Sequence, residues 1–373
     1  MAKPVNVLIV DDSAFMRKSL SMMLESDPQI KIIATARDGM EGYEKAKELR
    51  PDIITMDVEM PRMDGLTALA KIMKECPTPV IMVSSITTEG AEATLKAFEL
   101  GAVDFISKQM SYVSLDIVKI KEDLIDKVIT IARSSSLTRR LARIRNNVTP
   151  QLRQTSVSQT TYTQPTTDFQ IVTLGVSTGG PFSLQKIIPQ LPKEFPIPIL
   201  IVQHMPPKFT KSLADRINSM SKVTVKEAEH GETIQPGWVY IAPGGFHMKV
   251  QRSGYSNATL HISTEPSTTL HRPSVDVMME SAVQVYGGKI LGVIMTGMGH
   301  DGLDGLKLIK QKGGYCIAQN EDTCVVYGMP KAAVDNNLAD AIVPLENIPE
   351  TMVKAVKSQR DGFATKKNSV TTN

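Results

Sequence analysis

Short apolar runs alternate with amphipathic stretches along the first third of this chain of 373 residues. The runs are too short for helices and rich in Val and Ile, as buried parallel strands are, and they lie at 5–10, 30–36, 52–56, 79–84 and 103–107. The helix-like stretches lie at 13–26, 38–49, 64–75, 89–100 and about 114–132. Five βα units in succession predict an α/β domain with a doubly wound parallel sheet over residues 1–133.

The same alternation returns at residue 169 and continues to about residue 358. Strand-like runs lie at 169–176, 196–202, 288–295, 314–319 and 340–343. Three further segments alternate apolar and polar residues between Gly-rich turns, which predicts antiparallel hairpins, and they lie at 237–243, 246–251 and 258–263. We therefore expect a second doubly wound α/β domain over 169–358, mainly parallel and with an antiparallel hairpin.

The segment 134–168 has a different composition. Of its 35 residues, 21 are Ser, Thr, Gln, Asn or Pro, so it cannot bury enough apolar surface to offset its chain entropy. It is predicted to be a flexible linker, although its first part, LTRRLARIRNN, could extend the preceding helix for a few turns. The polar residues 359–373 are expected to form a disordered tail.

The overall composition limits the class of protein. A hydrophobic content of 42% and a charged content of 22% are typical of globular domains. A formal net charge of +3 implies no dominant field toward nucleic acid or a membrane surface. No apolar segment is long enough to span a bilayer, no secretory leader is evident, and Cys76, Cys316 and Cys324 match no CxxC spacing. We expect reduced, buried thiols in a cytoplasmic protein.

Acidic residues stand where the first and third strands of the first domain end. Asp11 and Asp12 close the first strand and Asp57 closes the third. Because ligands of such sheets bind beyond the carboxyl ends of the strands, these carboxylates should converge and suit Mg²⁺. Lys108, at the end of the fifth strand, supplies a mobile positive charge for a phosphoryl group, and Ser84 ends the fourth strand. The alternative is that these residues only cap helices.

These residues, with the loop DVEMPRMDG (57–65), make the segment 5–132 resemble a two-component receiver domain over its whole length. The resemblance implies that Asp57 accepts a phosphoryl group from a histidine kinase, and that Mg²⁺ is held by Asp11, Asp12, Asp57 and the backbone carbonyl of Glu59. It also implies that Ser84, Phe105 and Lys108 form the switch. Receivers usually have proline, after a cis bond, at the position that Gln109 occupies here.

A second group of strand ends carries Ser, His and Asp. Ser177 lies in GVSTGG (175–180), which fits the G-x-S-x-G pattern of a tight strand-to-helix turn with an exposed hydroxyl. Many Gly/Ser turns only cap helices, and a dinucleotide loop is disfavoured because G-x-G-x-x-G is absent. Among six histidines, His204 alone directly ends a long apolar run, and His247 and His300 are its rivals. Asp301, in MTGMGHDG (295–302), could orient the base.

Residues 170–356 resemble the catalytic domain of the CheB family of chemotaxis protein-glutamate methylesterases. The resemblance rests on six segments in the family's order: GVSTGG, IVQHMP (201–206), APGGFHM (242–248), HRPSVD (271–276), MTGMGHDG and VVYGMP (325–330). It implies that Ser177 is the nucleophile, His204 the general base and acid, and Asp301 the residue that orients the base. Thr178 and Met298 are then expected to support the oxyanion, and the catalytic domain needs no cofactor.

The combined resemblance implies a hydrolase that phosphorylation activates. It would remove methyl groups from glutamate methyl esters on chemoreceptors and deamidate receptor glutamines. A response regulator with a DNA-binding domain would need a compact basic helix-turn-helix, and none is evident after residue 169. A scaffold with a degenerate hydrolase fold is the remaining alternative, and the intact Ser, His and Asp positions argue against it.

Overall fold

A computed structural model describes residues 3–85, 87–108, 116–134, 137, 141, 167–254 and 257–357. The chain divides into two compact units, Met1–Thr155 and Ser156–Asn373, and the division falls within the expected linker 134–168. Most of that linker, Gln109 and the expected tail 359–373 lie outside the described residues. Among the described helices, none has both the length and the apolar character that crossing a bilayer requires.

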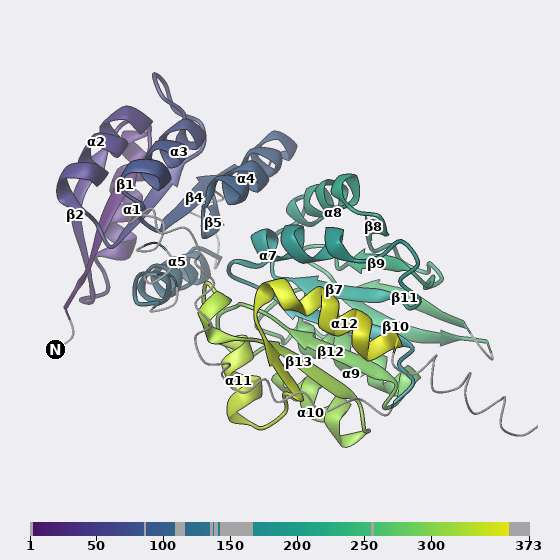
Figure 1. Ribbon diagram of the computed structural model, residues 1–373. Helices are drawn as coiled ribbons and strands as arrows, with labels where there is room; N and C mark the ends of the chain where they lie inside the picture. The colour runs from purple at the N-terminus through teal and green to yellow at the C-terminus, as the bar shows by residue number, and fades with distance from the viewer. Residues whose placement is uncertain are drawn as a thin grey trace, which may run out of the picture. The chain divides into compact units, whose positions relative to one another are not determined.

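The first unit contains a parallel sheet of five strands in the order β2-β1-β3-β4-β5 (Figure 1). The strands are β1 Val5–Val10, β2 Ile30–Ala36, β3 Ile53–Asp57, β4 Val80–Ser84 and β5 Asp104–Ser107. The helices are α1 Ala14–Leu24, α2 Gly39–Leu49, α3 Gly65–Glu75, α4 Thr88–Leu100 and α5 Asp116–Ala132. The chain passes from β1 to β2 on one side and returns to β3 on the other. The carboxyl ends of β1 and β3 therefore lie at the point where the strand order reverses.

Polar residues start the helices of this unit. Ser13, Asp38, Asp64 and Thr87 each accept a hydrogen bond from a backbone amide in the first turn of α1, α2, α3 and α4, respectively. Because these side chains satisfy amides that have no partner within the helix, they define where each helix begins. The predicted doubly wound fold and its five βα units are confirmed.

The second unit contains a parallel sheet of seven strands in the order β14-β13-β12-β6-β7-β9-β8. The strands are β6 Ile171–Val176, β7 Ile199–Gln203, β8 Thr224–Glu227, β9 Trp238–Ile241, β12 Ile290–Ile294, β13 Tyr315–Gln319 and β14 Ala341–Val343. β6 is first in the chain and lies between β7 and β12, so the strand order reverses beside it. The carboxyl ends of β12, β6 and β7 therefore form the expected place for a ligand.

Two features of this sheet differ from the sequence-based expectation. β9, within the segment 237–243 that was expected in an antiparallel hairpin, pairs in parallel with β7 and with β8. The hairpin prediction was wrong for that segment because the alternation of a short run does not reveal which distant strand it meets. β8 was not predicted, since it is a partly exposed edge strand of four residues. Only β10 His247–Ser253 and β11 Asn257–Ser263 form the predicted hairpin.

Helices cover the second sheet on both sides (Figure 1). They are α7 Gly180–Ile187, α8 Phe209–Met220, α9 Val275–Tyr286, α10 Leu303–Gln311, α11 Met329–Asp335 and α12 Ile348–Lys357, with short 3-10 turns η1 Ile188–Gln190, η2 Glu321–Thr323 and η3 Leu345–Asn347. The helix α9 contacts both β6 and the hairpin strand β10. Met278 and Met279 of α9 and Met248 and Val250 of β10 belong to the same buried apolar cluster. The start of α9 is thereby held close to the carboxyl ends of the central strands.

Candidate functional site

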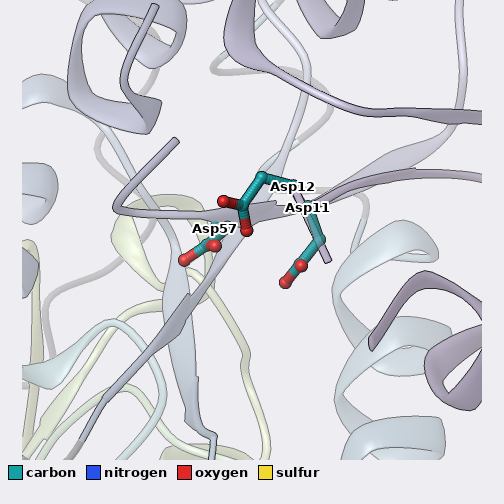
Figure 2. Close-up of side chains that lie close together, drawn as sticks. All are labelled: Asp11, Asp12 and Asp57. Atoms are coloured by element: carbon teal, nitrogen blue, oxygen red, sulfur yellow. The ribbon is translucent and has the colours of Figure 1, made fainter. Parts of the chain in front are cut away.

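Three carboxylates meet at the carboxyl ends of β1 and β3 in the first unit. One oxygen from each of Asp11, Asp12 and Asp57 lies within 4.8 Å of the others. Figure 2 shows the three side chains close together, Asp11 and Asp12 from adjacent positions and Asp57 from the neighbouring strand. Asp11 and Asp57 are buried and Asp12 is exposed. The predicted convergence of these residues is confirmed.

Lys108, which follows β5, is the basic group of this cluster. Its Nζ lies 2.5 Å from Asp57 Oδ2 and 3.5 Å from Asp11 Oδ2. Asp11 Oδ1 accepts a hydrogen bond of 2.8 Å from the amide of Ser13, whereas the buried Oδ2 makes no hydrogen bond. A buried carboxylate oxygen without a hydrogen bond, next to two further carboxylates, fits a hard divalent cation such as Mg²⁺.

The carboxylates of this cluster are difficult to ionise together. Burial raises the pKa of Asp57 to about 6, against the opposing effect of Lys108. Burial also raises the pKa of Asp11, again despite Lys108. For Lys108, burial acts to lower the pKa, but the hydrogen bond to Asp57 and the two acidic neighbours raise it overall. One ammonium group therefore does not compensate fully for the buried acids, which leaves a site that favours additional positive charge.

Two of the expected switch residues, Ser84 and Phe105, contact the helix α4. Ser84 Oγ donates to the carbonyl of Gly90 in α4 at 3.1 Å. Phe105 is 5% exposed, and its ring meets Phe98 edge-on at 6.2 Å between centroids. The amide of Glu59 donates to Asp57 Oδ1 at 3.3 Å. The hydroxyl of Ser84 and the ring of Phe105 thus both contact α4.

Ser177 follows β6 in a tight turn into α7. Its amide donates to the carbonyl of Thr296 at 3.0 Å, and its carbonyl accepts from the amide of Gly180 at 2.7 Å. Gly179 has a φ of +78°, and a Cβ there would lie 2.5 Å from Val325 Cγ2, so both conformation and space require glycine. The turn places Ser177 at the carboxyl edge of the sheet, partly exposed.

His204 lies next to Ser177 at that edge, because β6 and β7 pair with Val176 opposite Gln203. Its Nε2 lies 2.8 Å from Asp301 Oδ2, and its Nδ1 is buried and has no hydrogen-bond partner. Among the described residues, no hydrogen bond joins Ser177 Oγ to the imidazole. Since Nε2 is occupied by the carboxylate, Nδ1 is the nitrogen left to take a proton from a neighbouring hydroxyl.

Asp301 is held by the first turn of α9. Its Oδ1 accepts from Ser274 Oγ at 2.9 Å and from the amide of Asp276 at 3.0 Å, and its Oδ2 accepts from the amide of Val275 at 2.8 Å. Burial alone would raise the pKa of Asp301, but the hydrogen bond and charge of His204 and the backbone amides outweigh it and hold the pKa well below its usual range. A carboxylate that stays ionised can orient and stabilise a protonated imidazole.

The other histidines have different surroundings. His247 is fully buried, with Nε2 3.1 Å from the carbonyl of Pro266 and Nδ1 accepting from the amide of Ser274 at 3.3 Å. His300 is exposed. His271 stacks on His204 with ring centroids 4.2 Å apart. His271 ends no long apolar run, and its place in the HRPSVD segment was the only sequence signal for it.

The segment expected to support an oxyanion lies against the nucleophile turn. A Cβ at Gly297 would lie 2.8 Å from the Cβ of Ser177, and Met298 follows it. The carbonyl of Thr178 accepts from Thr296 Oγ1 at 2.9 Å. Thr178 and Met298 therefore both lie near Ser177, and their contribution to an oxyanion site remains a prediction.

Comparison with known proteins gives two family matches. Residues 172–352 match the CheB methylesterase family, and residues 7–117 match the response regulator receiver domain. A protein-glutamate methylesterase/protein-glutamine glutaminase 1 of Oleidesulfovibrio alaskensis is 51% identical over 369 residues, which cover 94% of this chain and 99% of that relative. A protein-glutamate methylesterase/protein-glutamine glutaminase of Pyrococcus horikoshii is 47% identical over 364 residues, covering 97% of this chain and 96% of the relative. A crystal structure of the Thermotoga maritima CheB methylesterase catalytic domain is 47% identical, with a TM-score of 0.49, and the match covers 50% of this chain and 98% of that one.

Proposed function

This chain belongs to the CheB methylesterase family and carries a response regulator receiver domain, and from that premise we propose how its two sites work. It is a phosphorylation-regulated protein-glutamate methylesterase and protein-glutamine glutaminase. Its substrates are then carboxyl derivatives on side chains of other proteins, methyl esters in one reaction and amides in the other. We propose chemoreceptors as those proteins and the cytoplasm as the compartment in which they meet.

Ser177 is the proposed nucleophile and His204 the proposed base. In the proposed mechanism His204 Nε2–H donates a hydrogen bond to Asp301, so Nδ1 is unprotonated. Nδ1 takes the proton of Ser177 Oγ as the hydroxyl attacks the ester carbonyl. The protonated imidazole then gives that proton to the departing methoxide. Methanol is released, and the acyl group remains bonded to Ser177 as an acyl-enzyme. Water, deprotonated by the same nitrogen, attacks the acyl group and restores the serine. With a glutamine substrate, the leaving group is ammonia.

The proposed oxyanion support comes from the nucleophile turn and the segment 296–298. Thr178 begins the turn into α7, whose N-terminal end carries partial positive charge. Met298 lies beyond Gly297, which packs against Ser177. Backbone amides of such segments can stabilise the charge that develops on the carbonyl oxygen during attack.

The observation that carries this proposal is the 2.8 Å contact between His204 Nε2 and Asp301 Oδ2, at an edge where Ser177 ends the adjacent strand. The test is methanol release from methylated receptor by Ser177→Ala and His204→Ala, with the exposed His300→Ala as control. Each of the first two should lose on the order of 10⁴-fold or more in turnover, and the control should stay within about threefold of wild type. Near-normal turnover in a folded Ser177→Ala protein would contradict the nucleophile assignment.

The first unit is the proposed phosphorylation site. Asp57 accepts the phosphoryl group from a histidine kinase, and Asp11, Asp12, Asp57 and the carbonyl of Glu59 would hold Mg²⁺. When bound, Mg²⁺ neutralises charge on the incoming phosphoryl group. Lys108, already 2.5 Å from Asp57 Oδ2, is placed to pair with a phosphoryl oxygen. Ser84 would then exchange its bond to α4 for one to the phosphoryl group, and Phe105 would move with it.

A further inference from the structure

We propose that Gln203 is a positioning residue that fixes the distance between the nucleophile and the base. This inference rests on the proposed roles of Ser177 and His204, and it assigns a function to a side chain for which the sequence pattern suggested none. Gln203 is the last residue of β7 and is 2% exposed. It stands immediately before His204 and opposite Val176, the residue before Ser177.

The carboxamide of Gln203 bridges the main chain of the two residues. Its Nε2 donates to the carbonyl of Ser177 at 3.1 Å and to the carbonyl of His204 at 3.2 Å. A primary amide nitrogen carries two hydrogens, so one group can satisfy both acceptors at once. The orientation of the amide follows from this chemistry, because a rotated group would place its oxygen against two carbonyl oxygens.

The carboxamide of Gln203 joins the two segments just beyond the last paired residues of β6 and β7, where the sheet no longer fixes the distance between them. The pairing of β6 with β7 ends at Val176 and Gln203, and only the amide of His204, 3.3 Å from the carbonyl of Val176, continues beyond it. Ser177 and His204 therefore lie past the last paired residues. The planar carboxamide of Gln203 bonds the main chain of both residues and replaces the hydrogen bonds of the sheet there. It thereby fixes the spacing of the two residues between which the proton is transferred.

The surroundings of Gln203 are built for this side chain. A Cβ at Gly180 would lie 1.9 Å from Gln203 Oε1, so the glycine leaves room for the carboxamide. Oε1 is buried and has no hydrogen-bond partner. Burying a carbonyl oxygen without a partner has a cost in stability, which an apolar side chain of similar size would avoid. The presence of an amide at this position is explained if its two donated hydrogen bonds fix the distance between Ser177 and His204.

The test uses the full-length protein with Gln203→Met, which keeps the volume and removes both donors, and Gln203→Glu, which keeps the shape. Gln185→Met is the matched control, since Gln185 also donates from Nε2 to a backbone carbonyl, that of Pro181 at 3.2 Å in α7. Two reactions are measured, methanol release from methylated receptor and the Ser177-dependent hydrolysis of 4-nitrophenyl acetate, with Ser177→Ala as the blank. Thermal unfolding of each variant confirms that it is folded at the assay temperature.

Gln203→Met should lower kcat by about 10- to 100-fold with little change in KM, as expected for a small displacement of reacting groups. Gln185→Met should stay within about twofold of wild type. In Gln203→Glu, a buried carboxyl group can donate one bond while protonated, so its kcat relative to wild type should fall as the pH rises. The same ratio for Gln203→Met should not change with pH.

Different results would contradict the positioning role of Gln203 and the proposed function. If wild type hydrolyses 4-nitrophenyl acetate through Ser177 but releases no methanol, the substrate assignment is wrong, and the ester assay still decides the role of Gln203. If folded Gln203→Met keeps wild-type kcat in the ester assay, the positioning role is wrong. The same conclusion follows if Gln203→Met and Gln185→Met lose activity equally, because Gln203 would then contribute only to packing.

Discussion

Replacing Asp301 by Asn should lower both turnover and stability, because four donors converge on this carboxylate. Oδ1 faces Ser274 Oγ and the amide of Asp276, and Oδ2 faces His204 Nε2 and the amide of Val275. An Asn side chain keeps only one oxygen. Whichever of the two oxygens the amide nitrogen replaces, that nitrogen faces a backbone N–H of fixed position, that of Asp276 or that of Val275.

The size of the effect follows from these contacts. The change leaves at least one donor without an acceptor and removes a charge that is largely buried beside His204 and the start of α9. Losses of this kind cost about 2–4 kcal/mol in free energy of unfolding. For a catalytic unit of this size, that corresponds to a fall of about 5–15 °C in the unfolding midpoint. Burial raises the pKa of Asp276 to about 6, and the charge of Asp301 raises it as well. Removing the repulsion between the two groups offsets part of the loss in stability.

The effect should depend on pH in a defined direction. The folded protein holds the pKa of Asp301 below the ordinary value of 3.8, so the carboxylate stabilises the fold above about pH 4. The difference in unfolding midpoint between wild type and Asp301→Asn should therefore be full at pH 7 and shrink as the pH falls below about 4. Calorimetry of the full-length protein across this range measures it.

Asp304→Asn provides the control, since Asp304 lies three residues further along the chain, in the first turn of α10, but is exposed and pairs with Lys307. Its midpoint should change by less than about 2 °C at pH 7. If Asp301→Asn unfolds at the wild-type temperature while Asp304→Asn does the same, the four hydrogen bonds do not stabilise the fold as described.

Three further outcomes are expected. His247→Ala should lower the unfolding midpoint measured by calorimetry, because it removes a fully buried ring that is hydrogen-bonded to the carbonyl of Pro266 and the amide of Ser274. An unchanged midpoint would show that these hydrogen bonds do not stabilise the fold. Removing Mg²⁺ with a chelator should prevent phosphorylation of Asp57 by a small phosphodonor without changing basal methanol release, and mass spectrometry that still finds the phosphorylated protein would contradict a metal role. A fragment beginning near Thr167 should release methanol without any phosphodonor, since it lacks the unit that phosphorylation controls, and an inactive but folded fragment would mean that the first unit is needed for activity.

The positions of the proposed catalytic residues and of the carboxylate cluster were predictable because they depend on local pattern. An apolar run that stops at Asp57 or Ser177 marks the carboxyl end of a buried strand, and parallel strands bring those ends to one edge. The same reasoning favoured His204 and left His247 and His300 as rivals, and the resemblance to the CheB family then implied His204. The contact between His204 and Asp301 agrees with that choice.

Features that depend on long-range packing were not predictable in the same way. The parallel pairing of β9 with β7 and β8 is set by tertiary contacts and not by the alternation within the strand. Nothing in the spacing of HRPSVD indicates that the first turn of α9 holds Asp301 or that His271 stacks on His204. The bridge made by Gln203 likewise requires two strands to be placed side by side before it can be seen.

The proposed control of Ser177-dependent ester hydrolysis by phosphorylation of Asp57 links the functions of the two units. It is tested most directly by measuring methanol release from methylated receptor with and without a phosphodonor, for wild type and Asp57→Ala. The donor should raise the wild-type rate severalfold or more, while Asp57→Ala should stay at the unstimulated rate under both conditions. Equal stimulation of both proteins, or no stimulation of wild type once mass spectrometry shows it to be phosphorylated, would show that phosphorylation of Asp57 does not control hydrolysis.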